Sequence, residues 1–223
     1  MTEANNSTLI FDFDGTLANT FDLVVDAVNS LASDYGFEPV SPAHCDYLRG
    51  LPAHKVLKLM SVSWYRIPEL IIKVQRYMKS RMDSVHFYPG IAEAIVSLKS
   101  AGFSLGIITS NSCENVEILL KKHQCNEFSF IHSARHVFGK SKALKVIIKQ
   151  RGLDKHSVYY IGDETRDIDA AKLCGIKSVA VTWGFNKKEL LMASHPSLLI
   201  DHVDELSTCL KNYHAESSIK SSR

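Results

Sequence analysis

The chain has 223 residues, 45% of them hydrophobic, which is enough for one large globular domain or for a core domain with a smaller insert. Its 26 Lys and Arg nearly balance its 24 Asp and Glu, and the net charge of +2 argues against a nucleic-acid or membrane partner and favours a small substrate. Five scattered cysteines without a CxxC pair, a polar amino-terminal stretch and no apolar run near the ~20 residues of a membrane span together predict a cytoplasmic protein with reduced thiols.

Short β-rich apolar runs alternate with stretches of helical periodicity along most of the chain. Strands that alternate with helices predict βαβ units and a mainly parallel sheet, and the nearly continuous apolar character of the runs indicates that helices cover both faces. We therefore expect an α/β fold with a Rossmann-like parallel core. The predicted strands are TLIFDFD (8–14), FSLGIITS (103–110), FSFIHS (128–133), SVYYIGD (157–163) and SVAVTW (178–183).

One long segment, from about Thr20 to His86, interrupts this alternation. It contains helical patterns punctuated by four prolines and no convincing strand. This pattern predicts a small helical domain inserted after the first strand. The expected division is a core of residues 1–17 and 87–212, a helical insert of residues 18–86 and a polar, disordered tail of residues 213–223.

Polar side chains follow the ends of several predicted strands. In an open parallel sheet the carboxyl ends of the strands meet at one edge, and ligands bind there. Residues far apart in the sequence are therefore expected to converge into one polar crevice. These residues are Asp12, Asp14, Thr109, Lys140, Asp163 and Asp167.

Asp12 and Asp14 have the spacing that places two side chains on the same side of a strand. Two carboxylates this close repel each other unless a cation lies between them or one is protonated. Asp163 would bring a third carboxylate, and oxygen ligands of this kind suit Mg²⁺. The alternative is that each aspartate separately caps a helix or a turn.

Four motifs follow one another in a diagnostic order: DFDGTLANT, IITSN, a lysine that opens a helix, and YIGDETRD. Together they resemble the haloacid dehalogenase superfamily, and most closely its phosphoglycolate-phosphatase-like branch. The resemblance covers about residues 8–212, and the helical insert falls where that branch carries a cap. It implies a Mg²⁺-dependent phosphohydrolase that acts on a small phosphorylated metabolite through an aspartyl-phosphate.

The resemblance also implies a role for each acidic residue. Asp12 would be the nucleophile, and Asp14 would be the general acid for the leaving alcohol and then the base that activates water. Mg²⁺ would be held by Asp12, by the main-chain carbonyl of Asp14 and by Asp163. Asp167 would orient the metal waters or the lysine from outside the coordination shell. The alternative for Asp163 and Asp167 is an ordinary place in the first turn of a helix.

The phosphate group would be bound by the remaining motif residues. Thr109 would donate to a phosphate oxygen, with Ser110 and Asn111 beside it, and Lys140 would pair with both the phosphate and Asp12. Thr109 could instead cap a turn, and Lys142 competes with Lys140 for its role. In the insert, Arg49 is a candidate for binding an anionic group of the substrate, or is a plain surface arginine.

Two further stretches are expected near this crevice. Gly15 and Thr16 make the turn into the insert, where a side chain larger than that of Gly15 should interfere. The sequence WGFN, residues 183–186, follows the last predicted strand and is expected to pack near the site without a chemical role.

Other functions compete with this interpretation. ARHVFGKS, residues 134–141, resembles a relaxed phosphate-binding loop, which with YYIGD would indicate a P-loop NTPase. That loop needs glycines where this chain has Ala134 and bulky residues, and the interpretation leaves Asp12 and Asp14 without a task. A phosphomutase would use the same two aspartates and differ mainly in its cap.

Overall fold

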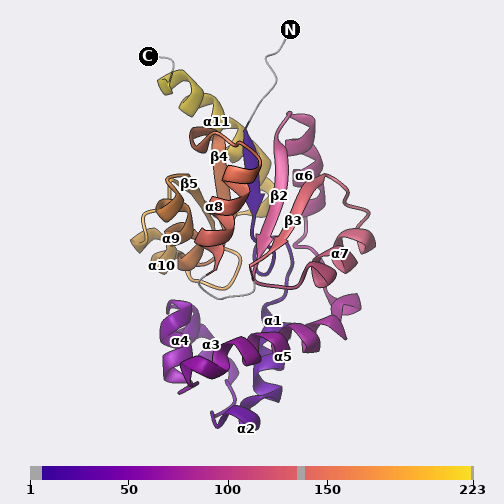
Figure 1. The fold of residues 1–223 in the computed structure, drawn as a ribbon, viewed down its shortest axis with the longest axis vertical. Helices are drawn as coiled ribbons and strands as arrows, with labels where there is room; N and C mark the ends of the chain where they lie inside the picture. Colours follow the sequence, from indigo (N-terminus) through magenta and orange to yellow (C-terminus); the bar gives the residue numbers. More distant parts are fainter. Residues whose placement is uncertain (1–6, 135–138, 222–223) are drawn as a thin grey trace.

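A parallel sheet of six strands, in the order β3-β2-β1-β4-β5-β6, organises the described part of the chain (Figure 1). The computed structural model describes residues 7–134 and 139–221. All five predicted apolar runs contain a strand, and the predicted α/β fold is confirmed. The sixth strand was not predicted, because its three residues are too few to show a pattern. The strands are β1 (Thr8–Phe11), β2 (Ser104–Thr109), β3 (Phe128–Ser133), β4 (Val158–Gly162), β5 (Lys177–Val181) and β6 (Leu198–Ile200).

Helices cover both faces of this sheet. Because alternate residues of a strand point to opposite sides, Phe11 packs in the cluster formed with α6, α7 and α11, whereas Ile10 packs in the cluster formed with α8 and α9. The short α10 adds Leu191 to Ile168 of α9 on that second side. The core helices are α6 (Ile91–Ser100), α7 (Cys113–Lys122), α8 (Lys140–Gln150), α9 (Thr165–Cys174), α10 (Lys188–Ala193) and α11 (Leu206–Ser221), with 3₁₀ turns η3 (Lys155–Ser157) and η4 (Val203–Glu205).

The helices between β1 and α6 form a separate layer. In Figure 1 they lie together below the sheet, on the side toward which the strand arrows point. They have a small apolar core of their own, built around Tyr35, Phe37 and Leu70. We refer to this layer as the helical insert. Its elements are α1 (Phe21–Ser30), α2 (Ala32–Tyr35), α3 (Pro42–Arg49), α4 (Ala53–Leu59), η1 (Trp64–Arg66), α5 (Ile67–Lys79) and η2 (Met82–Ser84).

The chain enters and leaves the helical insert through two segments that lie side by side. Asn19 N donates to His86 O at 2.9 Å, and Tyr88 N donates to Leu17 O at 3.0 Å. The two crossings therefore lie beside each other, at residues 17–19 and 86–88. The division into domains stays a prediction, which this pairing supports.

The carboxyl-terminal helix extends further than the sequence suggested. α11 continues through Tyr213 and His214, whose rings lie 6.1 and 6.2 Å from the ring of Tyr159. The predicted disordered tail is therefore wrong for residues 213–221. Polar composition suggested fraying, but these two aromatic residues tie the helix to the core.

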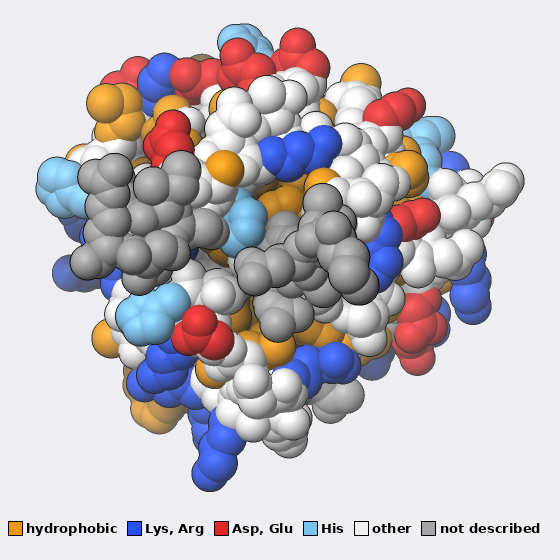
Figure 2. All heavy atoms as spheres, turned by 90° about the horizontal axis from the view of Figure 1, so that it is seen from above, with side chains coloured by type: hydrophobic (Ala, Val, Ile, Leu, Met, Phe, Trp, Pro, Cys, Tyr) orange, Lys and Arg blue, Asp and Glu red, His pale blue; other side chains and the backbone are white. Residues whose placement is uncertain are grey.

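The surface agrees with the balanced charge of the sequence. On the face opposite the helical insert, Figure 2 shows acidic and basic side chains in small groups of both signs. No helix of the described residues is long and apolar enough to cross a membrane. The cysteines Cys45, Cys113, Cys125, Cys174 and Cys209 are all free thiols.

Candidate active site

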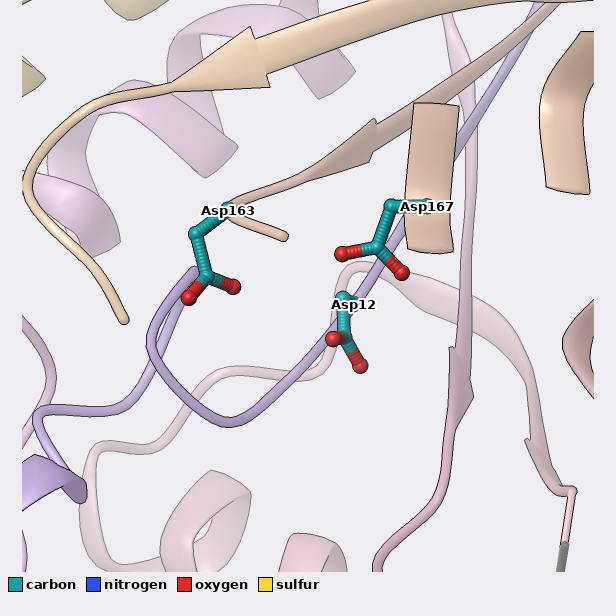
Figure 3. A group of neighbouring side chains, drawn as sticks. All are labelled: Asp12, Asp163 and Asp167. Atoms are coloured by element: carbon teal, nitrogen blue, oxygen red, sulfur yellow. The ribbon is translucent and has the colours of Figure 1, made fainter. Parts of the chain in front are cut away.

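Three buried aspartates from different elements converge at the carboxyl end of the sheet (Figure 3). Asp12 follows β1, Asp163 follows β4 and Asp167 lies in the first turn of α9. One carboxylate oxygen of each lies within 4.8 Å of the other two, and each residue is at most 1% exposed. They meet because β1 and β4 are paired neighbours, so the residues that follow both strands reach the same edge. We call these residues the acid cluster.

Lys140, the first residue of α8, is a cation that contacts two aspartates of the acid cluster. Its Nζ donates to Asp12 Oδ2 at 2.5 Å and to Asp167 Oδ1, and the side chain is 2% exposed. Lys142 is exposed on the same helix. The geometry therefore favours Lys140 over Lys142 as the lysine beside Asp12, the predicted nucleophile.

Burial controls the electrostatics of the acid cluster. Desolvation raises the pKa of Asp12 to about 7, although the charge of Lys140 lowers it, and desolvation also raises the pKa of Asp163. Desolvation lowers the pKa of Lys140, but the charges of Asp12 and Asp167 raise it overall. Three carboxylates beside one lysine leave an excess of two negative charges when all are ionised. A divalent cation with a preference for oxygen ligands, such as Mg²⁺, fits this donor set.

Asp163 is held in place by two donors from other segments. Thr16 Oγ1 donates to Asp163 Oδ1 at 2.6 Å, and Phe185 N donates to Asp163 Oδ2 at 2.7 Å. The WGFN stretch therefore reaches the site, and Trp183 Nε1 also donates to Thr16 O at 3.0 Å. The contact of Thr16 with Asp163 was not predicted, although the DGT motif contains this threonine.

Gly15 packs directly against Asp163. Its φ of +76° suits glycine, and a Cβ there would lie 2.2 Å from Asp163 Oδ2 and 2.4 Å from Phe185 Cδ2. The clash involves a carboxylate that is already hydrogen-bonded on both oxygens, so it cannot move away without breaking those bonds.

Substitution Gly15→Ala is expected to lower catalytic turnover by about 100-fold or more, because displacing the acid cluster by a fraction of an ångström misplaces the reacting groups. Gly175→Ala is the matched control, since Gly175 has a similar φ of +68° but no atom within 4 Å of the point that a Cβ would occupy. In both variants the free energy of unfolding should fall by about 1–2 kcal/mol, because alanine is strained in the left-handed backbone conformation. Steady-state kinetics and thermal unfolding separate the two effects, and wild-type turnover in Gly15→Ala would contradict the packing argument.

Asp14 is linked to the end of β2. Asn111 Nδ2 donates to Asp14 Oδ1 at 3.0 Å, and Asn111 N donates to Thr109 Oγ1 at 3.0 Å. Thr109 is fully buried. Desolvation raises the pKa of Asp14 to about 6, against the lowering effect of hydrogen bonds from Thr20 and Asn111. The structure thus brings Asp14, the predicted general acid, beside residues 109–111, which are predicted to bind the phosphate group. Asp14 itself lies outside the acid cluster.

Asp167 combines both interpretations that the sequence left open. Its Oδ2 accepts from Glu164 N at 3.1 Å, as an acidic residue in a helix's first turn does, while its Oδ1 accepts from Lys140. The same carboxylate thus starts α9 and holds the lysine of the acid cluster.

Arg49 is not a plain surface arginine, because its guanidinium donates hydrogen bonds to the core. Its Nη2 donates to Gly184 O at 2.7 Å and its Nε donates to Phe185 O at 3.2 Å. The peptide unit between Gly184 and Phe185 is therefore bonded on both sides, to Arg49 through its carbonyl and to Asp163 through its N–H. A role of Arg49 in binding the substrate stays a prediction.

A second contact joins the helical insert to the core at Ser110, in the segment predicted to bind the phosphate group. Gln75 of α5 donates from Nε2 to Ser110 O at 2.5 Å, and its main-chain oxygen accepts from Asn115 Nδ2 at 3.1 Å. Ser110, predicted to bind substrate, thus has its carbonyl engaged by the helical insert. No pattern in the sequence points to Gln75.

A cavity of about 300 Å³ lies between the helical insert and the core. The core lines it with Asp14, Ser110, Asn111 and the pair of Glu164 and Arg166. Arg166 Nε donates to Glu164 Oε2 at 2.7 Å. The volume is at the lower end of the range of ~300–1,000 Å³ that is common for small-molecule sites. Most of the other lining residues are aliphatic and come from the helical insert.

The stretch 134–141, which resembles a phosphate-binding loop, is described only in part. Its residues 135–138 lie outside the described part of the chain. Its lysine, Lys140, donates to Asp12 and Asp167, so this charge is placed on the acid cluster.

Known proteins resemble the chain over most of its length. The sequence model of the haloacid dehalogenase-like hydrolases matches residues 9–181. Phosphoglycolate phosphatase of Synechococcus elongatus is 33% identical over 199 residues, which cover 89% of this chain and 94% of that protein. Pyrophosphatase PpaX of Bacillus cereus is 26% identical over 213 residues, which cover 92% of this chain and 97% of that protein.

Solved structures share the fold. A predicted phosphatase from Clostridium acetobutylicum matches with a TM-score of 0.80 at 21% identity, covering 92% of this chain and 98% of that one. A predicted phosphoglycolate phosphatase from Haemophilus somnus matches with a TM-score of 0.71 at 19% identity, covering 92% of this chain and 97% of that one.

Proposed function

Because the chain belongs to the haloacid dehalogenase-like hydrolase family, we propose that it is a Mg²⁺-dependent phosphomonoesterase that acts on a small phosphorylated metabolite. The family assignment made from the motifs is confirmed, and the relatives named as phosphatases support the enzyme class. The observation that carries the proposal is the convergence of Asp12, Lys140 and the pair of Asp163 and Asp167 from three separate segments.

Mg²⁺ fits the residues that are present. Asp12 and Asp163 would hold the ion, together with the main-chain carbonyl of Asp14, and Asp167 would orient its surroundings through Lys140. When bound, Mg²⁺ supplies positive charge that reduces the repulsion between a carboxylate and a phosphate dianion. The buried excess of negative charge supports this assignment.

The protein's own residues would carry two displacement steps. In the first, an oxygen of Asp12 attacks phosphorus, the P–O bond to the alcohol breaks and Asp14 gives its proton to the leaving oxygen. In the second, Asp14 takes a proton from water, whose oxygen attacks phosphorus and releases Asp12 with inorganic phosphate. A pKa of about 6 suits Asp14 to both tasks near neutral pH. Lys140 would orient Asp12 and favour its ionised form.

Removing divalent cations tests the proposal. EDTA is expected to lower phosphate release from 4-nitrophenyl phosphate by at least about 100-fold, because metal-ion stabilisation of the transition state is worth several kcal/mol. Excess Mg²⁺ should restore the rate, and EDTA already saturated with Mg²⁺ is the control. Full activity in excess EDTA would contradict the proposal.

The phosphomutase alternative is tested by the product. A phosphomonoesterase releases inorganic phosphate from a sugar phosphate, whereas a phosphomutase returns an isomerised sugar phosphate. The P-loop NTPase alternative is disfavoured by the contacts of Lys140, whose ammonium group lies on two carboxylates. It predicts Mg-ATP affinity that depends on Lys140 and not on Asp12.

A further inference from the structure

We propose that the alcohol part of the substrate is apolar, an alkyl or aryl group that occupies the cavity between the helical insert and the core. This inference rests on the proposed function, which places the phosphoryl group at the acid cluster. It names the chemical class of the leaving group, and it follows from how the cavity is lined.

The cavity opens beside the reacting groups. Asp14 lines it, and so do Ser110 and Asn111 from the predicted phosphate-binding loop. Since Asp14 would protonate the leaving oxygen, the carbon atoms attached to that oxygen would extend from Asp14 into this space. The walls of the cavity therefore select the leaving group.

Those walls expose aliphatic side chains that lie outside the apolar core clusters. Six of them are half-buried, and none joins any of the four core clusters formed by the described residues. Apolar surface left uncovered in this way is stabilised when an apolar occupant removes it from water. The six residues are Val25, Val40, Leu48, Leu51, Val56 and Ile71.

The charged groups of the cavity wall are engaged with protein partners. Arg49 directs Nε and Nη2 to main-chain carbonyls, and Arg166 directs its Nε and Nη2 to Glu164. A carboxylate such as that of phosphoglycolate would have to compete with these partners for a cation. An apolar group makes no such demand.

Two amide side chains of the wall, those of Gln75 and Asn186, are engaged as well. Gln75 donates to Ser110 O, and Asn186 accepts from Thr165 N while its Nδ2 donates to Leu51 O. The bonds of Gln75 to Ser110 and of Asn186 to Leu51 join the helical insert to the core. Most of the wall that remains for an alcohol group to contact is aliphatic.

A series of monoalkyl phosphates tests the inference with the whole protein and Mg²⁺. From ethyl to butyl to hexyl phosphate, kcat/KM is expected to rise about fourfold for each methylene, or about 250-fold over the four methylenes of the series, as follows from the burial of each methylene. Phosphoglycolate is expected to react at least about tenfold less efficiently than hexyl phosphate.

A double variant links the effect to the cavity. Val25→Thr with Val56→Thr keeps side-chain shape but places two hydroxyl groups in the wall, which is expected to lower kcat/KM for hexyl phosphate about tenfold and to leave ethyl phosphate within twofold. The matched control is Val96→Thr with Val146→Thr, on the outer sides of α6 and α8 at 50% and 37% exposure. The control should change neither substrate.

The outcomes separate the two proposals. No phosphate release from any monoester would overturn the proposed function and this inference with it. Release that does not depend on chain length, or that favours phosphoglycolate over hexyl phosphate, would overturn the apolar leaving group alone. Activity on ethyl phosphate reports whether each variant is folded.

Discussion

Asparagine in place of Asp12 is expected to lower phosphate release by on the order of 10⁴-fold or more, because an amide oxygen cannot serve as the attacking group. The variant should remain folded. Asn has nearly the shape of Asp, Lys140 keeps its bond to Asp167, and burial already disfavours the charge at position 12, as its raised pKa of about 7 shows. Single-turnover release of phosphate and urea unfolding measure the two effects.

The control for this experiment is an aspartate of α9 that faces solvent. Asp169→Asn removes one carboxylate two residues from Asp167 but leaves the acid cluster intact. It should keep turnover within about twofold, as is usual for a surface substitution. Wild-type turnover in Asp12→Asn would show that the nucleophile has been assigned to the wrong residue.

The second large effect is on stability. Lys140→Met is expected to lower the free energy of unfolding by about 3–5 kcal/mol in EDTA at pH 8, because it leaves Asp12 and Asp167 buried without their shared cation. Adding Asp167→Asn to that variant removes one of the stranded charges and should recover part of the loss. Urea unfolding of the two single variants and the double variant gives the coupling energy.

Lys142→Met is the matched control for the lysine, since it lies on the same helix and is exposed. It should change stability by no more than about 0.5 kcal/mol. Equal losses in Lys140→Met and Lys142→Met would contradict the assignment of Lys140 to the acid cluster.

The loss in Lys140→Met is expected to depend on pH. The folded-state pKa of Asp12 is about 7, above the value of ~3.9 in an unfolded chain, so the folded protein holds a proton that the unfolded chain releases. Without Lys140 that pKa rises further. The deficit should be smaller at pH 5, where Asp12 is protonated in both proteins, and should grow as the pH rises above about 7.

The sequence predicts the centre of this site well because its signals are local. A strand that runs into DFD brings Asp12 to the carboxyl edge of the sheet, and the rule that parallel strands share this edge adds Asp163. Neither step needs knowledge of how helices pack. The same reasoning gives the five longer strands but not β6, whose three residues carry no period. The two-residue period does not extend to Asp14, because β1 ends at Phe11.

The contacts between the helical insert and the core could not be predicted in this way. Arg49 and Gly184 are 135 positions apart, and Gln75 reaches Ser110 across 35 positions. Their partners are main-chain carbonyls, which every residue has, so no residue pattern marks them. The apolar cavity was missed for a similar reason, since aliphatic residues at helical spacing predict a packed core equally well.

The peptide unit between Gly184 and Phe185 connects the helical insert to the acid cluster. Its carbonyl oxygen accepts a hydrogen bond from Arg49, and its N–H donates one to Asp163. Hydrogen bonds on both sides of one amide strengthen each other by polarisation. A movement of the helical insert that removed the Arg49 guanidinium from Gly184 O would therefore weaken the hydrogen bond from Phe185 N to the Asp163 carboxylate. The amide would thus couple the position of the helical insert to the proposed metal ligand.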